Sequence, residues 1–176
     1  PTPENTVVIK KGDSLLIDLW AKLDRPGGIF YDVTWCGFVG QNPPAKYLEI
    51  FDVVCRARDA CLAYIREQVS KTGTCRGCDA DDACRQVVID AGYGDFFDHR
   101  TGHSIGEEVH WTGANIDNLE TKDERELVAG CCFSIEPGIY LEGEMAVRTE
   151  IDGYVRDNGE VAVVGDIQKE LILMDV

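Results

Sequence analysis

Two aspartates lie inside stretches that are otherwise typical of buried β-strands, and this placement limits the possible folds more than any other feature. Asp18 interrupts the apolar run of residues 15–20, and Asp32 lies between Tyr31 and Val33. An ionised carboxylate among buried side chains is costly unless a cation or strong hydrogen-bond donors compensate it. The chain must therefore fold so that both acids meet such a partner.

The two acids are expected to share one face of a β-hairpin. The pattern predicts two strands around a Pro-Gly-Gly turn, at residues 13–20 and 29–39. Asp18 and Asp32 are fourteen positions apart with Arg25 at the midpoint, so a hairpin centred there places them nearly opposite each other. Like charges this close repel unless something positive lies between them.

A second pair of acids repeats the pattern. Two further strands are predicted at residues 131–141 and 146–155. Glu136 and Glu150 are also fourteen positions apart, with Gly143 at the midpoint. Pro137-Gly138 interrupts a regular ladder, so we expect the two glutamates to tend to face each other and do not predict exact pairing. Two such hairpins would together form a basin of four carboxylates.

The remaining pattern predicts a single α+β domain. Helical spacing of apolar residues predicts two helices, one after Pro43-Pro44 as far as residues 71–73 and one over residues 79–91. Asp79, Asp81 and Asp82 fall in the first turn of the second helix, where they suit the positive end of its dipole. A polar stretch and two short strands complete the chain, at residues 112–126, 160–164 and 169–174.

The charge balance favours cations over nucleic acid as partners. The 176 residues carry 32 acidic against 17 basic side chains, a formal net charge of −15. Such a field repels phosphate backbones, so no nucleic-acid partner is expected. No apolar run is long enough to cross a bilayer and no signal peptide opens the chain, so we expect a cytoplasmic protein without a membrane partner.

Eight cysteines permit three interpretations of one cluster. Cys75, Cys78 and Cys84 resemble half of a zinc site, but no second C-x-x-C pair or nearby histidine completes it. We favour plain thiols, because a reducing compartment is expected. A structural zinc ion and a disulfide between Cys75 and Cys78 stay open.

All three histidines of the chain fall within residues 98–111, as His99, His103 and His110. His103 is the obvious fifth ligand for a cation held by the four carboxylates. Each acid or histidine taken alone has an ordinary interpretation, as a surface or hydrogen-bonded residue. Together, the two hairpins and the clustered histidines favour a metal site.

The motifs resemble those of the pita-bread metallopeptidases, a family that includes methionine aminopeptidase, aminopeptidase P, prolidase and the non-metal relative creatinase. The motifs occur in the family's order and span most of the chain, as I-D-L-W (17–20), Y-D-V-T (31–34), H-R-T-G-H-S-I-G-E-E-V-H (99–110), F-S-I-E-P-G-I-Y (133–140) and V-R-T-E (147–150). The resemblance implies a partial pita-bread fold, in which helices cover a curved, mainly antiparallel sheet.

The resemblance also implies two divalent metal ions held by five residues. Asp32 and Glu150 would bridge both ions, Asp18 would complete one site, and His103 and Glu136 would complete the other. Hard oxygen donors with one imidazole suit manganese or cobalt better than a closed structural zinc site. We expect Mn²⁺, with Co²⁺ or Zn²⁺ as alternatives.

Within the family, His99 and Arg148 resemble the Xaa-Pro peptidases, aminopeptidase P and prolidase. The resemblance implies a metallopeptidase that hydrolyses the bond before proline through a metal-bridging hydroxide. Glu136 would accept and deliver a proton, and His110 would stabilise the tetrahedral intermediate. His99 would contact a proline-containing peptide substrate, and Arg148 would orient a carboxylate or a neighbouring acid.

The sequence departs from the family pattern in three places. Trp111 stands where many relatives have an acid, and the first hairpin is longer than usual through residues 24–28. Residues 1–176 resemble the C-terminal part of a single catalytic domain, without its N-terminal part. We therefore expect such a piece to be weakly active or inactive alone, and its uncovered apolar surface to favour a homodimer.

Two other functions stay open at this stage. Some pita-bread domains bind peptides or proteins without catalysis, although these generally lose metal ligands. A metal-dependent hydrolase of non-peptide substrates would need the same ligands. A preference for dipeptides or for longer peptides is also left open.

Overall fold

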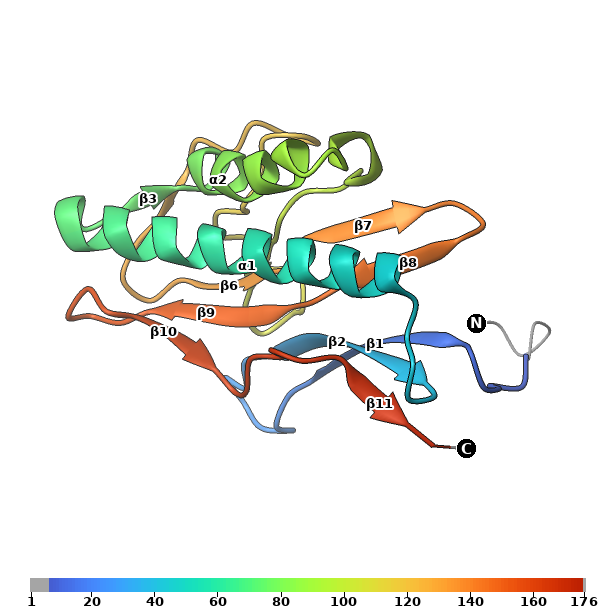
Figure 1. The fold of residues 1–176 in the computed structure, drawn as a ribbon. Helices are drawn as coiled ribbons and strands as arrows, with labels where there is room; N and C mark the ends of the chain where they lie inside the picture. The colour runs from blue at the N-terminus through green and yellow to red at the C-terminus, as the bar shows by residue number, and fades with distance from the viewer. Residues whose placement is uncertain (1–6, 176) are drawn as a thin grey trace.

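The structure is a computed structural model that describes residues 7–175. Within that range a long helix crosses the middle of the molecule, between a shorter helix on one side and most of the strands on the other (Figure 1). The helical elements are α1 (Ala45–Thr72), α2 (Gly77–Asp90) and the short 3-10 helix η1 (Gly94–Phe96). No helix among the described residues is both long and apolar enough to cross a bilayer.

Seven strands of residues 7–175 form two sheets. The first has the order β1-β2-β11, from Ser14–Ala21, Tyr31–Val39 and Ile172–Met174. The second has the order β10-β9-β6-β4, from Val161–Val164, Ile151–Val155, Cys132–Ile135 and Ser104–Ile105. Two small pairs complete the strands, β3 with β5 (Cys75–Arg76, Glu126–Leu127) and β7 with β8 (Gly138–Leu141, Met145–Arg148).

Helix α1 begins and ends where the sequence predicts. Pro44 is its N-cap, and the backbone turns out of the helix at Gly73 with φ of 82°, a conformation that glycine adopts without strain. The apolar residues at helical spacing, from Tyr47 to Val69, are buried. They pack with Phe133, Ile135 and other residues on one face of the second sheet, which leaves the opposite face of that sheet for polar side chains.

The first hairpin pairs in a different register from the one predicted. Asp18 lies opposite Thr34, and Trp20 lies opposite Asp32. The turn is therefore centred on Pro26, one residue beyond Arg25, and the two aspartates are diagonal neighbours on one face. The connection over residues 22–30 outside the strands is long enough to allow this shift.

The second hairpin follows the predicted register throughout. Gly138 pairs with Arg148 on one side of Pro137, and Ile135 pairs with Ile151 on the other. Both pairs have Gly143 at their midpoint, so Glu136 lies across from Glu150 at the break between the two ladders. Because neither glutamate belongs to a strand, both can be aimed by their own local contacts.

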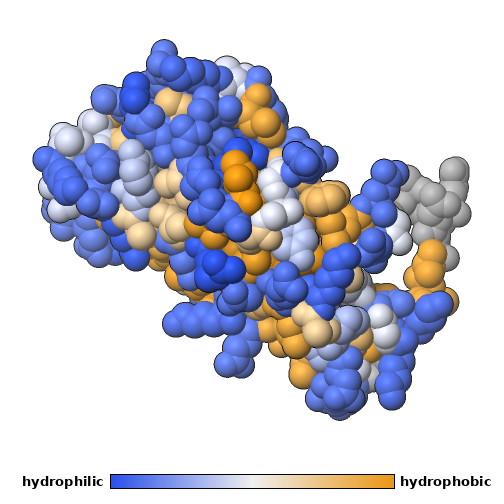
Figure 2. Space-filling view, turned by 45° about the horizontal axis from the view of Figure 1, so that its top comes forward, coloured by the Kyte–Doolittle hydropathy of each residue, from blue (hydrophilic) through white to orange (hydrophobic). Residues whose placement is uncertain are grey.

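Apolar side chains remain exposed on the outer face of β1. Ile17 and Leu19 are each 61% exposed, and Leu23 beyond the strand is 65% exposed. Figure 2 shows that hydrophobic side chains also reach the surface elsewhere, between hydrophilic ones. The expected homodimer stays a prediction.

Gly102, directly before His103, tests how tightly the sheet is packed at the site. A Cβ at this residue would lie 2.0 Å from the carbonyl oxygen of Ser134, a backbone atom that cannot move aside easily. We expect Gly102→Ala to lower the free energy of unfolding by about 1–3 kcal/mol in urea denaturation. The exposed Ser70→Ala on α1 is the control and is expected to change stability by less than about 0.5 kcal/mol. An unfolding midpoint equal to that of the wild type would contradict this packing.

Candidate metal centre

Three of the five predicted ligands meet in one buried cluster. Asp32 belongs to β2, His103 precedes β4, and Glu150 precedes β9. One ligand atom from each lies within 4.8 Å of the others, and the three residues are 3–4% exposed. Segments that are more than a hundred residues apart in the chain therefore converge on this point.

The imidazole of His103 is oriented as a metal ligand would be. Its Nδ1 lies 3.2 Å from the carbonyl oxygen of Ser104, so Nδ1 carries the proton and donates it there. Its Nε2 therefore presents a lone pair, and it lies 3.3 Å from Glu136 Oε1 and 3.6 Å from Asp32 Oδ2. A lone pair facing two carboxylates is unfavourable without a cation, and Asp32 Oδ1 is buried without a hydrogen-bond partner.

These residues fit a divalent cation. Two donors that each bind an ion at about 2.1 Å lie about 3 Å apart, close to the separations seen here. Carboxylate oxygens with one neutral imidazole suit manganese-type ions rather than a thiolate zinc site. Glu136 therefore joins Asp32, His103 and Glu150 as a fourth candidate ligand.

Asp18, the fifth predicted ligand, lies at the rim. Its carboxylate forms an ion pair with Arg148 and is 44% exposed. Arg148 also donates to Thr34 Oγ1 from Nε and Nη2, each at 3.1 Å, and its Nε lies 3.8 Å from Glu136 Oε2. The structure thus places Asp18 beside the cluster, with Arg148 as the cation that offsets its charge.

Burial shapes the electrostatics of the cluster in the protein alone. Loss of solvent and then the charge of Asp18 together raise the pKa of Asp32 to about 6, against the lowering effect of Arg148. Burial also raises the pKa of Glu136 to about 7, against the lowering effect of Arg148. For Glu150, burial and then the charges of Glu136 and Asp32 raise the pKa to about 9. Burial lowers the pKa of His103 to about 4, so its imidazole stays neutral.

Hydroxyl groups hold the carboxylates in place. Thr34 Oγ1 donates to Glu150 Oε2 at 2.7 Å, and the backbone N–H of Glu150 donates to the carbonyl oxygen of Thr34 at 3.1 Å. Ser134 Oγ donates to Glu136 Oε1 at 3.1 Å and accepts from the backbone N–H of His103 at 2.9 Å. Glu136 and Glu150 are therefore each oriented by a neighbouring hydroxyl group, as metal ligands commonly are.

Asp152 is a buried acid that the sequence interpretation missed. It lies in β9, is 4% exposed, and its Oδ2 accepts a 2.8 Å hydrogen bond from the backbone N–H of Asp32. Burial raises its pKa to about 7. An acid inside a predicted strand was the signal that identified Asp18 and Asp32, and the same signal was present here.

The other two histidines flank the cluster in different ways. The exposed His110 packs its ring against that of His103, with 4.3 Å between the ring centres. His99 donates from Nδ1 to the carbonyl oxygen of Arg100 at 2.7 Å, and its Nε2 lies 2.8 Å from the hydroxyl of Tyr140. Burial lowers the pKa of His99. The sequence interpretation did not identify Tyr140 as its partner.

The long tip of the first hairpin packs on the histidine segment. The backbone N–H of Phe30 donates to the carbonyl oxygen of Gly106 at 3.0 Å, and Lys22 Nζ donates to that of Glu107. Trp111, 44% exposed, is held by a 2.8 Å bond from its N–H to the carbonyl oxygen of Ser104. The long hairpin tip and Trp111, two of the three departures from the family pattern, therefore both bond to residues 104–107.

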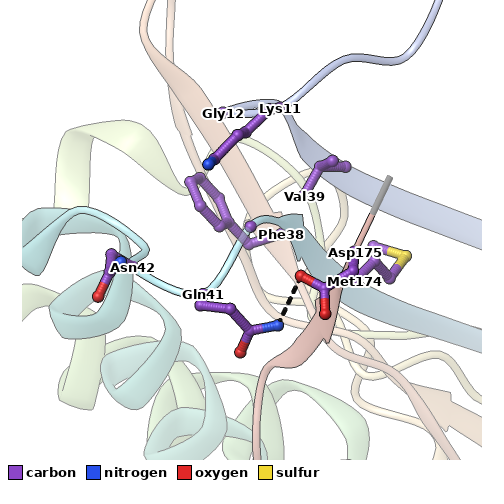
Figure 3. A pocket seen from close by; sticks show the side chains of 9 residues that line it. Lys11, Gly12, Phe38, Val39, Gln41, Asn42, Met174 and Asp175 are labelled. Atoms are coloured by element: carbon purple, nitrogen blue, oxygen red, sulfur yellow. Dashed lines mark hydrogen bonds between the residues drawn. The ribbon is translucent and has the colours of Figure 1, made fainter.

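The cysteine cluster does not form a zinc site among the described residues. Asp32, His103 and Glu150 are the only group of three there whose ligand atoms converge, and all eight cysteines are free thiols. Cys75 and Cys78 bond instead to Arg76 and Asp79. A cavity of about 230 Å³ beside β2 and β11 is also separate from the site, and Gln41 bonds to Asp175 at its wall (Figure 3).

Three carboxylates and one neutral imidazole, buried where two sheets meet beside a long helix, form a set of side chains that could hold a divalent cation. The chain belongs to metallopeptidase family M24, whose model matches residues 1–157.

Relatives and solved structures agree with this membership. An uncharacterised peptidase of Staphylococcus saprophyticus is 33% identical over 162 residues, covering 89% of this chain and 41% of the relative. The Xaa-Pro dipeptidase of Pyrococcus furiosus is 32% identical over 152 residues, covering 86% and 39%. A dipeptidase structure from Pyrococcus horikoshii OT3 matches with a TM-score of 0.80 at 32% identity, covering 94% and 42%.

The likeness confirms the expected pita-bread fold and its α+β class. The chain spans about two fifths of the length of these relatives.

The raised carboxylate pKa values predict an unusual pH dependence of stability without metal. Folded pKa values above the unfolded values of about 4 mean that the folded state binds more protons. This contribution is therefore full below about pH 4 and is lost as the pH rises through about 6 to 9. We expect the melting temperature in EDTA to fall between pH 5 and 9 in thermal scans.

Mn²⁺ is expected to reverse that loss, because it binds the ionised carboxylates. At a hundred times its Kd it would contribute about 2.7 kcal/mol, a rise of about 5–10 °C in Tm at pH 8. Asp32→Asn is expected to abolish most of this rise. Equal stabilisation of wild type and Asp32→Asn would exclude this cluster as the metal site.

Proposed function

We propose that the protein is a dinuclear metal-dependent Xaa-Pro peptidase of the prolidase or aminopeptidase P type. The observation that carries the proposal is the convergence of Asp32, His103, Glu136 and Glu150 around one buried point beside Arg148 and His99. The names of the Xaa-Pro dipeptidases among the relatives support proline-containing peptides as substrates.

Five side chains would hold two ions. Asp32 and Glu150 would be shared, His103 and Glu136 would serve one ion, and Asp18 the other. Mn²⁺ is the proposed metal, because four carboxylates and one imidazole form a mainly hard donor set. When bound, such ions lower the pKa of a water molecule and polarise the carbonyl of the scissile bond.

Glu136 is the residue that would move a proton. Ser134 Oγ donates to its Oε1, while its Oε2 faces Arg148 Nε at 3.8 Å. In the protein alone, burial raises the pKa of Glu136 to about 7. With an ion bound, the carboxylate oxygen that does not bind it could still accept and deliver a proton. The proposed transfer runs from the attacking water to the nitrogen of the departing proline.

The flanking residues would bind and orient the substrate. His110 is exposed and can donate to the oxygen that becomes negative during attack. The neutral His99, held between Phe97 and Tyr140, would contact the proline side of the bond. Arg148 can bind a substrate carboxylate through the guanidinium edge it now directs at Asp18 and Thr34.

The wider assignment is also a proposal. We propose that the chain is the C-terminal part of a pita-bread catalytic domain of a cytoplasmic protein. The exposed Ile17 and Leu19 on β1 support a further covering layer or a homodimer contact on that face.

The test is hydrolysis of Xaa-Pro dipeptides and tripeptides with added Mn²⁺, by this chain and by a form extended to the length of its relatives. We expect the extended form to be far more active. His110→Ala is expected to lower kcat by about 10²–10³ with little change in KM, because it acts on the transition state. Asp32→Asn is expected to remove activity and Mn²⁺ binding together.

Asp52→Asn, on the exposed face of α1, is the matched control and should leave activity unchanged. Cleavage of dipeptides alone would favour the prolidase type, and cleavage of tripeptides the aminopeptidase P type. Activity that persists without metal or in Asp32→Asn would overturn the proposal. Tight peptide binding without turnover in the extended form would favour a non-catalytic binding domain.

A further inference from the structure

Helix α2 carries a buried ion pair outside the metal cluster. Asp81 is fully buried, and Arg85 one turn later lies with its Nη2 3.2 Å from Asp81 Oδ1. The sequence pattern predicts that Asp81 serves the helix dipole, but the structure directs its side chain inward instead. A buried charge of this kind is costly unless all its bonds are made, so the contacts of both partners are informative.

Arg85 binds the segment that carries His99. Its Nη1 donates to the carbonyl oxygen of Phe97 at 2.8 Å, and its Nη2 donates to that of His99 at 2.8 Å. The guanidinium also lies 4.1 Å from the centre of the Phe97 ring, which in turn packs edge-on against the His99 ring at 5.1 Å. One side chain therefore fixes both the backbone and the ring of His99.

Asp81 binds the next part of the same segment. Its Oδ1 accepts hydrogen bonds from the N–H and the hydroxyl of Thr101, and its Oδ2 accepts from the N–H of Asn118 at 2.9 Å. The carbonyl oxygen of Thr101 accepts a 2.7 Å hydrogen bond from the N–H of Glu136. Asp81 is thus two contacts away from a candidate metal ligand.

We propose that Asp81 and Arg85 are positioning residues that fix His99 and Glu136 relative to each other from α2. An i, i+4 pair on one helix gives the two contacts a rigid common base. Residues 97–103, between η1 and β4, belong to no helix or strand. The hydrogen bonds from Asp81 and Arg85 therefore hold this segment in place, as ladder hydrogen bonds hold a strand. The inference rests on the proposed function in that His99 and Glu136 belong to the site.

The first test is the nitrogen-15 spectrum of the histidine rings in Arg85→Lys. Lysine keeps the charge opposite Asp81, so the protein should fold, but its single ammonium cannot bind both carbonyl oxygens. We expect the His99 ring signals to move from those of one tautomer, protonated at Nδ1, towards averaged values. His110, which Arg85 does not contact, should keep its signals.

Arg56→Lys is the matched control, because Arg56 forms an i, i+4 pair with Asp52 on the exposed face of α1. It should leave all three histidines unchanged. Unaltered His99 signals in Arg85→Lys would overturn the proposal. So would an equal shift of His110, because that would indicate general loosening of the fold.

The second test follows Glu136 in Asp81→Asn. We expect faster hydrogen exchange of the Glu136 amide and Mn²⁺ binding that is weaker by roughly tenfold, as for other residues that orient metal ligands. Unchanged exchange and affinity would exclude a role for Asp81 at Glu136. If Asp81→Asn does not fold, Arg85→Lys still decides the question. Failure of the wild type to bind Mn²⁺ would count against the proposed function alone, since the ring spectra and amide exchange need no metal.

Discussion

Repulsion among carboxylates gathered away from water is the constraint on which the rest of this molecule depends. Asp32, Glu136 and Glu150 surround the lone pair of a neutral imidazole, and burial raises the pKa of each acid. In the protein alone, Arg148 relieves part of this repulsion and protons held by the acids relieve the rest. A bound cation relieves the repulsion while the acids stay ionised. The arrangement of the carboxylates therefore favours the binding of a metal ion.

The cluster forms where two sheets that share no strand meet. Thr34 and Glu150 form one backbone and one side-chain hydrogen bond across this junction. The carboxylate of Asp152 accepts the hydrogen bond of the Asp32 backbone N–H, which in a regular ladder would go to a carbonyl oxygen. Side chains therefore join the two halves of the site. This explains why polar residues are fully buried here beside an apolar core packed on α1.

Strand acids, turn residues and helical spacing were enough to predict the two hairpins, α1 and the residues of the cluster. The register of the first hairpin was wrong by two positions, because turn length over residues 22–30 is poorly determined by residue type. Asp81 was misassigned because α2 begins at Gly77, two residues before the predicted start, so that only Asp79 lies in its first turn. The partners Tyr140 and Arg85 come from segments distant in sequence, and no local pattern specifies such contacts.

The second hairpin keeps one register on both sides of its break. The two hairpins are therefore expected to differ in how well they tolerate changes of length. Adding one residue to the turn at Gly143 would slide one strand past the other and rotate Glu136 or Glu150 to the helix-covered face. An extra residue at the tip of the first hairpin can be absorbed as a larger loop. We therefore expect changes of length to be tolerated at the tip of the first hairpin and not at the turn of the second, where they would alter the spacing of Glu136 and Glu150.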